Sequence, residues 1–250
     1  MSTDTLTPSP TLGLTGERTL PGIPEENYWF RRHEAAYAAV VPWVTGAHVV
    51  EAGAGEGYGA ALLAETARSV LALDYDAAAA AHAAVRYPEL TVARANLAAL
   101  PVRDGSADVI VNLQVIEHLW DQPGFLAECA RALRPAGTLV VTTPNRLTFS
   151  PGEDAPVNPF HTRELTAAEL AELLAPHFRV VRMYGVHHGP RIGRFDKHFR
   201  GFTAAQLATP PAEWHPALRR AVANVRITDF RITEDGIDAS LDLFAVAIKR

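Results

Sequence analysis

The sequence predicts an α/β fold in which a doubly wound, mostly parallel sheet of seven strands is covered by helices on both faces. Short apolar stretches alternate with stretches of helical periodicity along most of the chain, which is typical of such a sheet. A glycine-rich turn directly follows the first apolar stretch, where sheets of this kind bind ligands. The expected strands are 47–53, 69–76, 90–97, 107–114, 137–145, 178–186 and 241–250.

Helices are expected between the strands, and one precedes them. In the leading helix, Pro24, Glu25 and Glu26 suit a first turn, where acidic side chains oppose the helix dipole, and apolar residues follow at helical spacing up to Pro42. These patterns place a helix directly before every strand of the predicted sheet except the fourth and the last, and the last strand follows a longer insertion. The expected helices are 24–42, 58–67, 77–87, 123–133 and 167–177.

The chain of 250 residues is expected to form one domain over 21–250. Residues 1–20 are rich in Thr, Pro, Ser and Gly and are expected to be a loose N-terminal tail. Residues 190–235 are too long for a simple connection, and 215–225 have a helical pattern. We therefore expect a helical insertion before the last strand that caps one edge of the sheet.

Composition narrows the functional class. Hydrophobic residues make up 48% and charged residues 20%, which allows a sizeable core. The net charge of −5 argues against nucleic acid or an anionic membrane as a general partner. Cys129 is the single cysteine, so no disulfide framework is expected. The N-terminus has no pattern of a signal peptide, and no apolar run is long enough for a membrane helix. We expect a cytoplasmic protein. A homodimer is the starting expectation for its oligomeric state.

The stretch EAGAGEGYGA, residues 51–60, has the features of a ligand-binding loop. Gly53, Gly55 and Gly57 stand at alternate positions, and glycine lets a ligand approach the backbone closely. Asp74 ends the second strand, where an acid binds two ribose hydroxyls. A dinucleotide site normally needs G-x-G-x-x-G, and Glu51 would repel a pyrophosphate. An acid there suits an ammonium or sulfonium group, so an NAD-dependent enzyme is the less favoured alternative.

These positions resemble the class I S-adenosylmethionine-dependent methyltransferases, which have a Rossmann-like fold. The first family motif, E/D-x-G-x-G-x-G, is matched from Glu51 to Gly57, and the resemblance covers about residues 30–186. It implies S-adenosylmethionine as the cofactor. The early helix carries Arg32 and His33, which we expect near the methionine carboxylate of the cofactor. The cofactor-binding residues that the resemblance implies are Glu51, Gly53, Gly55, Gly57, Asp74, Asn96, Leu97, Asn112 and Gln114.

The acceptor side of the cleft follows the fourth and fifth strands. Glu117, His118 and His161 are expected there, and one carboxylate with two imidazoles suits a divalent cation. The arrangement resembles the E-x-x-E-H motif of the small-RNA 2′-O-methyltransferases and the ubiquinone-pathway O-methyltransferases, with Gln114 in place of the first glutamate. We expect Mg²⁺, with Glu117 and His118 as catalytic residues. A metal-free histidine base and a purely structural role are the alternatives.

A narrower resemblance concerns the acceptor. ENYWFRRHEAAY, VIEHLWDQ and NPFHTREL are similar to segments of actinobacterial O-methyltransferases of methylated polysaccharides, of the methylmannose or methylglucose type. This implies a hydroxyl of a sugar or oligosaccharide as the methyl acceptor, and His188 in VHHGPR is a further candidate base or sugar contact. The alternatives are a phenol or quinone-like metabolite as the acceptor and a cofactor-binding module without catalysis.

Overall fold

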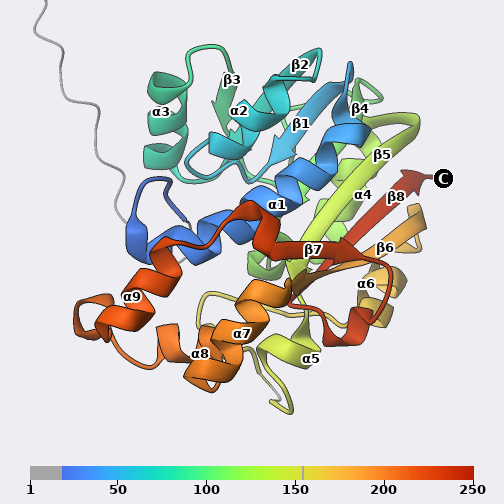
Figure 1. Cartoon of the computed structure of the whole chain (residues 1–250). Coiled ribbons are helices and arrows are strands. Elements are labelled where there is room, and N and C mark those ends of the chain that lie inside the picture. Colours follow the sequence, from blue (N-terminus) through green and yellow to red (C-terminus); the bar gives the residue numbers. More distant parts are fainter. Residues whose placement is uncertain (1–18, 154) are drawn as a thin grey trace, which may run out of the picture.

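The computed structural model describes residues 19–153 and 155–250. Its centre is a sheet of eight strands within the described residues, in the order β3-β2-β1-β4-β5-β8-β6-β7 (Figure 1). Neighbours from β3 to β5 pair in parallel, whereas β8 is antiparallel to β5 and β6. The strands are β1 (His48–Ala52), β2 (Ser69–Asp74), β3 (Thr91–Arg94), β4 (Ala107–Leu113), β5 (Leu133–Pro144), β6 (Phe178–His188), β7 (Phe230–Thr233) and β8 (Asp242–Lys249).

Helices surround this sheet, and the longest of them, α1, lies across one face (Figure 1). Pro42 lies in the last turn of α1, and the helix continues for two residues beyond it, to Val44. The helices are α1 (Asn27–Val44), α2 (Tyr58–Ala64), α3 (Ala77–Arg86), α4 (Gln122–Ala132), α5 (Arg146–Phe149), α6 (Ala167–Leu174), α7 (Pro190–Phe199), α8 (Phe202–Leu207) and α9 (Pro216–Ala223). No helix among the described residues is long and apolar enough to cross a membrane.

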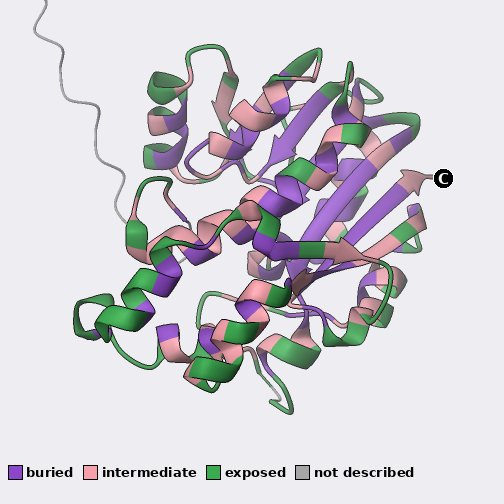
Figure 2. Cartoon of the chain, viewed as in Figure 1, coloured by how far each residue is buried: buried purple, intermediate pink, exposed green. Residues whose placement is uncertain are grey.

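Successive residues of the central strands point to opposite faces, and each face has its own core. On one face, Val49 of β1 packs with apolar residues of α1 and α2. On the other face, Val50 packs with apolar residues of α4 and α6. Figure 2 shows the central strands buried over most of their length. The sheet is therefore covered on both faces, as the alternation of strands and helices predicts.

The prediction of seven strands is wrong, because β7 is an eighth strand. β7 pairs antiparallel with the end of β6, from Gly185 opposite Thr233 to His188 opposite Phe230. It lies within 190–235, the segment that was expected to cap the sheet as a helical insertion. That segment contains α7, α8 and α9 and then returns to the edge of the sheet through β7.

A third apolar cluster joins this segment to α1. Tyr28 of α1 is completely buried there, together with Phe202 of α8 and Leu218 of α9. The predicted tail over 1–20 lies outside the described residues except for its last two. Of these, Thr19 is 9% exposed, and its hydroxyl lies 3.2 Å from the hydroxyl of Tyr58.

Candidate active site

A cavity of about 670 Å³ lies at the carboxyl ends of β1, β2 and β4. Sheets of this type bind ligands at this edge, next to the first strand. Nine of the predicted site residues line it: Arg32, His33, Gly53, Gly55, Asp74, Asn96, Leu97, Gln114 and His118.

The glycine loop has a backbone that other residues adopt only under strain. The φ angles are +96° at Gly53, +54° at Gly55 and +97° at Gly57. A Cβ at Gly53 would lie 2.5 Å from Val115 Cγ2, whereas one at Gly55 would meet nothing within 4 Å. The loop is fixed to the second strand, because the Gly55 amide donates to Asp74 Oδ2 at 2.7 Å. This hydrogen bond therefore holds the glycine loop and Asp74, the acid that we expected at this place, together.

Glu51 lies beneath the cavity rather than in its lining. It is 1% exposed, and burial raises its pKa to about 8. Tyr37, which does line the cavity, donates its hydroxyl proton to Glu51 Oε1 at 2.5 Å. Glu51 Oε2 is buried and has no hydrogen-bond partner among the described residues. A cationic ligand in the cavity above Glu51 would lower this pKa and stabilise the carboxylate, so the position suits such a ligand.

The end of β4 is held by its own polar side chains. Asn112 is completely buried and donates from Nδ2 to the carbonyl of Ala52 at 2.7 Å, so it supports the first strand from below the cavity. Gln114 has a φ of +56°, and its Nε2 donates to Thr142 Oγ1 at 3.2 Å. Gln114 lines the cavity, whereas Asn112 does not.

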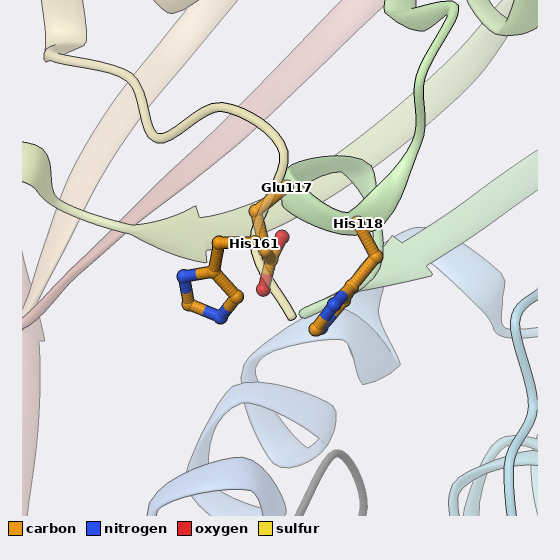
Figure 3. Close-up of side chains that lie close together, drawn as sticks. All are labelled: Glu117, His118 and His161. Carbon is orange, nitrogen blue, oxygen red and sulfur yellow. The ribbon is translucent and has the colours of Figure 1, made fainter. Parts of the chain in front are cut away.

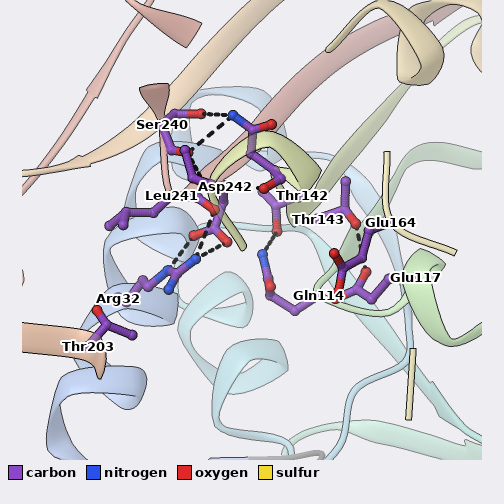
Figure 4. A network of polar contacts seen from close by, with 12 residues as sticks. Arg32, Gln114, Glu117, Thr142, Thr143, Glu164, Thr203, Ser240, Leu241 and Asp242 are labelled. Atoms are coloured by element: carbon purple, nitrogen blue, oxygen red, sulfur yellow. Dashed lines mark hydrogen bonds and ion pairs between the residues drawn. The ribbon is translucent and has the colours of Figure 1, made fainter. Parts of the chain in front are cut away.

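Arg32 forms a buried ion pair with Asp242 that the sequence did not predict. Its Nε donates to Asp242 Oδ2 at 2.6 Å, its Nη2 also pairs with Asp242, and the two side chains are 4% and 3% exposed (Figure 4). Both residues line the cavity. His33 also lines it, and burial lowers its pKa to about 4, so its ring is neutral at neutral pH. His33 can therefore offer a ligand a hydrogen bond but not a charge.

Glu117, His118 and His161 form a compact cluster beside the cavity (Figure 3). One carboxylate oxygen and one ring nitrogen from each histidine lie within 4.8 Å of one another. The two imidazole rings are 4.9 Å apart and nearly perpendicular. Glu117 and His118 belong to the short 3-10 helix after β4, and His161 comes from the loop before α6. The structure thus brings together all three residues that were predicted as metal ligands.

Hydrogen bonds fix the orientation of both histidines. His118 Nδ1 donates to the carbonyl oxygen of Phe160 at 3.0 Å. His161 Nδ1 donates to Glu164 Oε1 at 2.6 Å, and Asn158 Nδ2 lies 3.0 Å from His161 Nε2. In neutral rings that carry their proton on Nδ1, the lone pair is on Nε2, which is how histidines bind metals in many proteins. A cation at this place would displace the Asn158 amide.

Glu117 is buried in this cluster. It is 1% exposed, and burial raises its pKa to about 8, although Thr143 donates a hydrogen bond to Oε2 at 3.0 Å. A nearby cation would favour the carboxylate form. The donor set, one carboxylate and two imidazoles, therefore fits a divalent cation in its chemistry.

His188 lies elsewhere. It is neither part of the cluster nor among the residues that line the cavity. The hydroxyl of Tyr28 lies 2.7 Å from its Nε2, and its ring packs near Phe230. Burial lowers its pKa to about 4. The structure gives His188 a packing position between α1 and β7 and does not bring it to the acceptor side.

Several cavity residues escaped the sequence analysis. Thr19, Tyr37 and Tyr58 all line the cavity, and so does Asp242. A Cβ at Gly59 would lie 2.0 Å from Tyr37 Cζ. The glycine at position 59 therefore marks the place of Tyr37, but this can be recognised only with the structure. Thr19 lies in the segment predicted as the N-terminal tail, and Asp242 lies in the predicted last strand, 241–250, without a predicted role in the site.

Comparisons with known proteins agree with this geometry. The family model "Methyltransferase domain" matches residues 50–141. A probable S-adenosylmethionine-dependent methyltransferase of Mycolicibacterium smegmatis is 54% identical over 245 residues, which is 95% of either chain. One of Mycobacterium tuberculosis is 53% identical over 246 residues, 95% of this chain and 90% of the other. The chain therefore belongs to the S-adenosylmethionine-dependent methyltransferases. The cofactor of this family is S-adenosylmethionine, and the cavity with its glycine loop, Asp74 and buried Glu51 fits that group.

Solved structures show the same fold. The complex of the Haloferax volcanii Trm112 methyltransferase activator with a methyltransferase contains a chain that aligns with a TM-score of 0.62 at 20% identity, covering 90% of this chain and 91% of that one. A shorter sequence similarity concerns a ubiquinone biosynthesis O-methyltransferase of Parvibaculum lavamentivorans, which is 46% identical over 48 residues, 19% of either chain. The first likeness supports the α/β methyltransferase fold, and the second covers only a local segment.

Proposed function

We propose that the protein is a cation-assisted O-methyltransferase that transfers a methyl group to a hydroxyl of a sugar or oligosaccharide. The observation that carries this proposal is the cluster of Glu117, His118 and His161, with both histidine Nδ1 atoms occupied by hydrogen bonds. Such a cluster at the acceptor side of a cofactor cavity supports activation of an oxygen nucleophile. The narrower acceptor class rests on the resemblance to methyltransferases of methylated polysaccharides.

Bound S-adenosylmethionine supplies an electrophilic methyl group on a sulfonium centre. The residues of this chain have three tasks beside it. The glycine loop and Asp74 hold the cofactor against the first two strands. Glu117, His118 and His161 would hold a divalent cation such as Mg²⁺, which lowers the pKa of a hydroxyl that it binds. Alignment of the acceptor oxygen with the methyl group then provides much of the rate acceleration.

The shape of the acceptor side favours an extended acceptor. An open and polar segment 190–235 would suit a sugar chain, whereas a small and aromatic-lined one would suit a phenol. Among the described residues, none from 190–235 lines the cavity. Instead this segment packs against α1 and β6. The cleft is thus not roofed by the insertion, which supports a large polyhydroxylated acceptor over a small enclosed one.

A phenol or quinone-like acceptor is the second candidate. The local similarity to a ubiquinone biosynthesis O-methyltransferase favours it. Adjacent phenolic oxygens would suit the same cation, so the cluster does not separate the two acceptors. The absence of residues 190–235 from the cavity lining and the narrower resemblance favour the sugar.

The test measures cofactor binding first and methyl transfer second. S-adenosylmethionine is titrated by calorimetry, and transfer of a labelled methyl group is then followed with neutral glucose and mannose oligomers and with a simple diphenol. Each assay is run with EDTA and after restoring Mg²⁺, Mn²⁺ or Zn²⁺. His161→Ala is compared with His198→Ala, which changes an exposed histidine on α7.

We expect methylation of an oligosaccharide that EDTA abolishes and a cation restores, with activity lost in His161→Ala and kept in His198→Ala. EDTA-indifferent methylation would contradict the cation and favour a histidine base in its place. Methylation of the diphenol alone would establish the second candidate.

A further inference from the structure

Two aromatic side chains are exposed beside the cluster. Trp120 is 94% exposed and Phe160 is 44% exposed. Large aromatic side chains are usually buried for much of their surface in a folded protein, so an almost fully exposed indole beside a cavity is a candidate ligand contact. Trp120 also lines the cofactor cavity next to His118. The exposed indole is therefore part of the opening of this cavity.

The segments that carry these two aromatics are joined to each other at the cluster. The Thr162 hydroxyl donates to the carbonyl of Leu119 at 2.8 Å, one residue before Trp120. The Thr162 amide donates to the carbonyl of Glu117 at 2.7 Å. Phe160 accepts the His118 Nδ1 proton on its own carbonyl at 3.0 Å. The backbones of Leu119, which precedes Trp120, and of Phe160 thus take part in the hydrogen bonds that join the two loops and orient His118.

The ligand at this place has to meet two kinds of surface at once. The cluster demands hydroxyl oxygens, and the aromatic rings offer flat apolar faces. A pyranose ring meets both demands, because its C–H groups form an apolar face while its hydroxyls project from the edge. Aromatic side chains with an apolar body are well suited to such mixed ligands, since they bury area at a low cost in conformational entropy.

We propose that Trp120 and Phe160 form a stacking subsite for a pyranose ring of the acceptor, beside Glu117, His118 and His161. The inference rests on the proposed function and adds the residues that hold a ring of the acceptor. Stacking on Trp120 places the hydroxyl edge of a sugar toward the cluster. Trp120 and Phe160 then determine acceptor affinity and leave the chemical step to the cluster.

The experiment compares Trp120→Ala, Trp120→Phe and Phe160→Ala with the parent chain. Leu207→Ala is the control, because Leu207 is 67% exposed on α8 and lies outside the cavity lining. Methyl transfer is measured over a range of glucose and mannose oligomers and a simple diphenol, and S-adenosylmethionine binding is measured by calorimetry for every variant.

For an oligosaccharide acceptor we expect Trp120→Ala to raise KM by about tenfold, as for loss of an aromatic anchor that the acceptor covers on binding, with kcat and cofactor affinity nearly unchanged. Trp120→Phe should restore part of the loss, Phe160→Ala should raise KM less, and Leu207→Ala should have no effect.

Three results would overturn the subsite. If oligosaccharides are methylated and Trp120→Ala leaves their KM unchanged, the subsite is wrong and the proposed function stands. If Trp120→Ala weakens S-adenosylmethionine binding as much as it raises KM, Trp120 serves the cofactor. If only the diphenol is methylated, the proposed function and the subsite fail together.

Discussion

His161 Nδ1 lies 2.6 Å from Glu164 Oε1, and the two side chains are 5% and 1% exposed. A buried carboxylate that accepts the Nδ1 proton of a histidine leaves the lone pair on Nε2 and makes that nitrogen a better ligand. Glu164 Oε2 has no hydrogen-bond partner among the described residues. A buried and half-satisfied acid is costly for folding, so its position beside His161 favours a role in orienting the ring.

Glu164→Gln tests this role. The amide oxygen can still accept from His161 Nδ1, but the negative charge is lost. We expect affinity for Mn²⁺ or Co²⁺ to fall by about tenfold, within the range known for such supporting carboxylates. Calorimetric titration of each ion measures the change, and S-adenosylmethionine binding should stay as in the parent chain. Glu172→Gln, an exposed change on α6, is the control. Equal metal affinities in both variants would remove Glu164 from the site.

The stability of the cofactor-free chain should depend on pH through Glu51. Burial raises its pKa to about 8, from 4.5 for an ordinary glutamate. The folded chain thus keeps a proton that the unfolded chain releases between these values. The contribution is fully present below pH 4.5 and is lost as the pH rises through about 8.

Glu51→Gln should make stability less dependent on pH, because the amide keeps the Tyr37 hydrogen bond without a proton to lose. Urea unfolding from pH 5 to pH 8.5 measures this, and the limiting slope for one group is about 1.4 kcal/mol per pH unit. Glu117 has a similarly raised pKa, so part of the pH dependence should remain. Glu65→Gln, at an exposed position after α2, should follow the parent chain. Parallel curves for all three chains would contradict the prediction.

Local patterns predicted much of the fold and the cofactor loop. The strands before Gly53 and Asp74 are continuous in sequence with the residues that they present, so apolar stretches and turns were sufficient to place them. β7 was missed because its four residues, Phe230–Thr233, gain their pairing from the distant end of β6. A short strand of this kind depends on its partner more than on its own propensity.

The candidate site shows the same limit of prediction from local sequence. His161 and Glu117 were predicted to meet because both follow strands that end at the acceptor side of the cleft, and the resemblance to known motifs supported this prediction. No local signal linked Arg32 to Asp242, which is 210 residues further along the chain. His188 has suitable chemistry and a suitable position after a predicted strand. In the structure it contacts the aromatic cluster around Tyr28 instead of facing the acceptor side. Long-range packing decided each of these three cases.

Two glycines of the loop should differ in their tolerance of alanine. Both Gly53 and Gly55 have positive φ, which costs an L-residue about 1–2 kcal/mol. Only at Gly53 would a Cβ also strike Val115, at 2.5 Å from Cγ2. Gly53→Ala should therefore lose a further 1–3 kcal/mol, roughly the cost of overpacking, and should weaken S-adenosylmethionine binding more than Gly55→Ala. Urea unfolding and calorimetry compare the two, and equal losses would show that the Val115 contact relaxes freely.

The buried pair of Arg32 and Asp242 joins α1 to the first residue of β8. Asp242→Asn leaves the Arg32 guanidinium buried without its counter-charge, which should cost about 3–5 kcal/mol of unfolding free energy. Asp104→Asn is the matched control, because Asp104 is 79% exposed in its pair with Arg131 and such pairs contribute about 1 kcal/mol or less. Urea unfolding of both variants decides the point. Replacing Arg32 by Met in the Asp242→Asn chain removes the orphaned charge and should recover part of the loss. If Asp242→Asn cost no more than Asp104→Asn, water or another group would be neutralising Arg32, and the pair would not be what fixes α1 against the cofactor cavity.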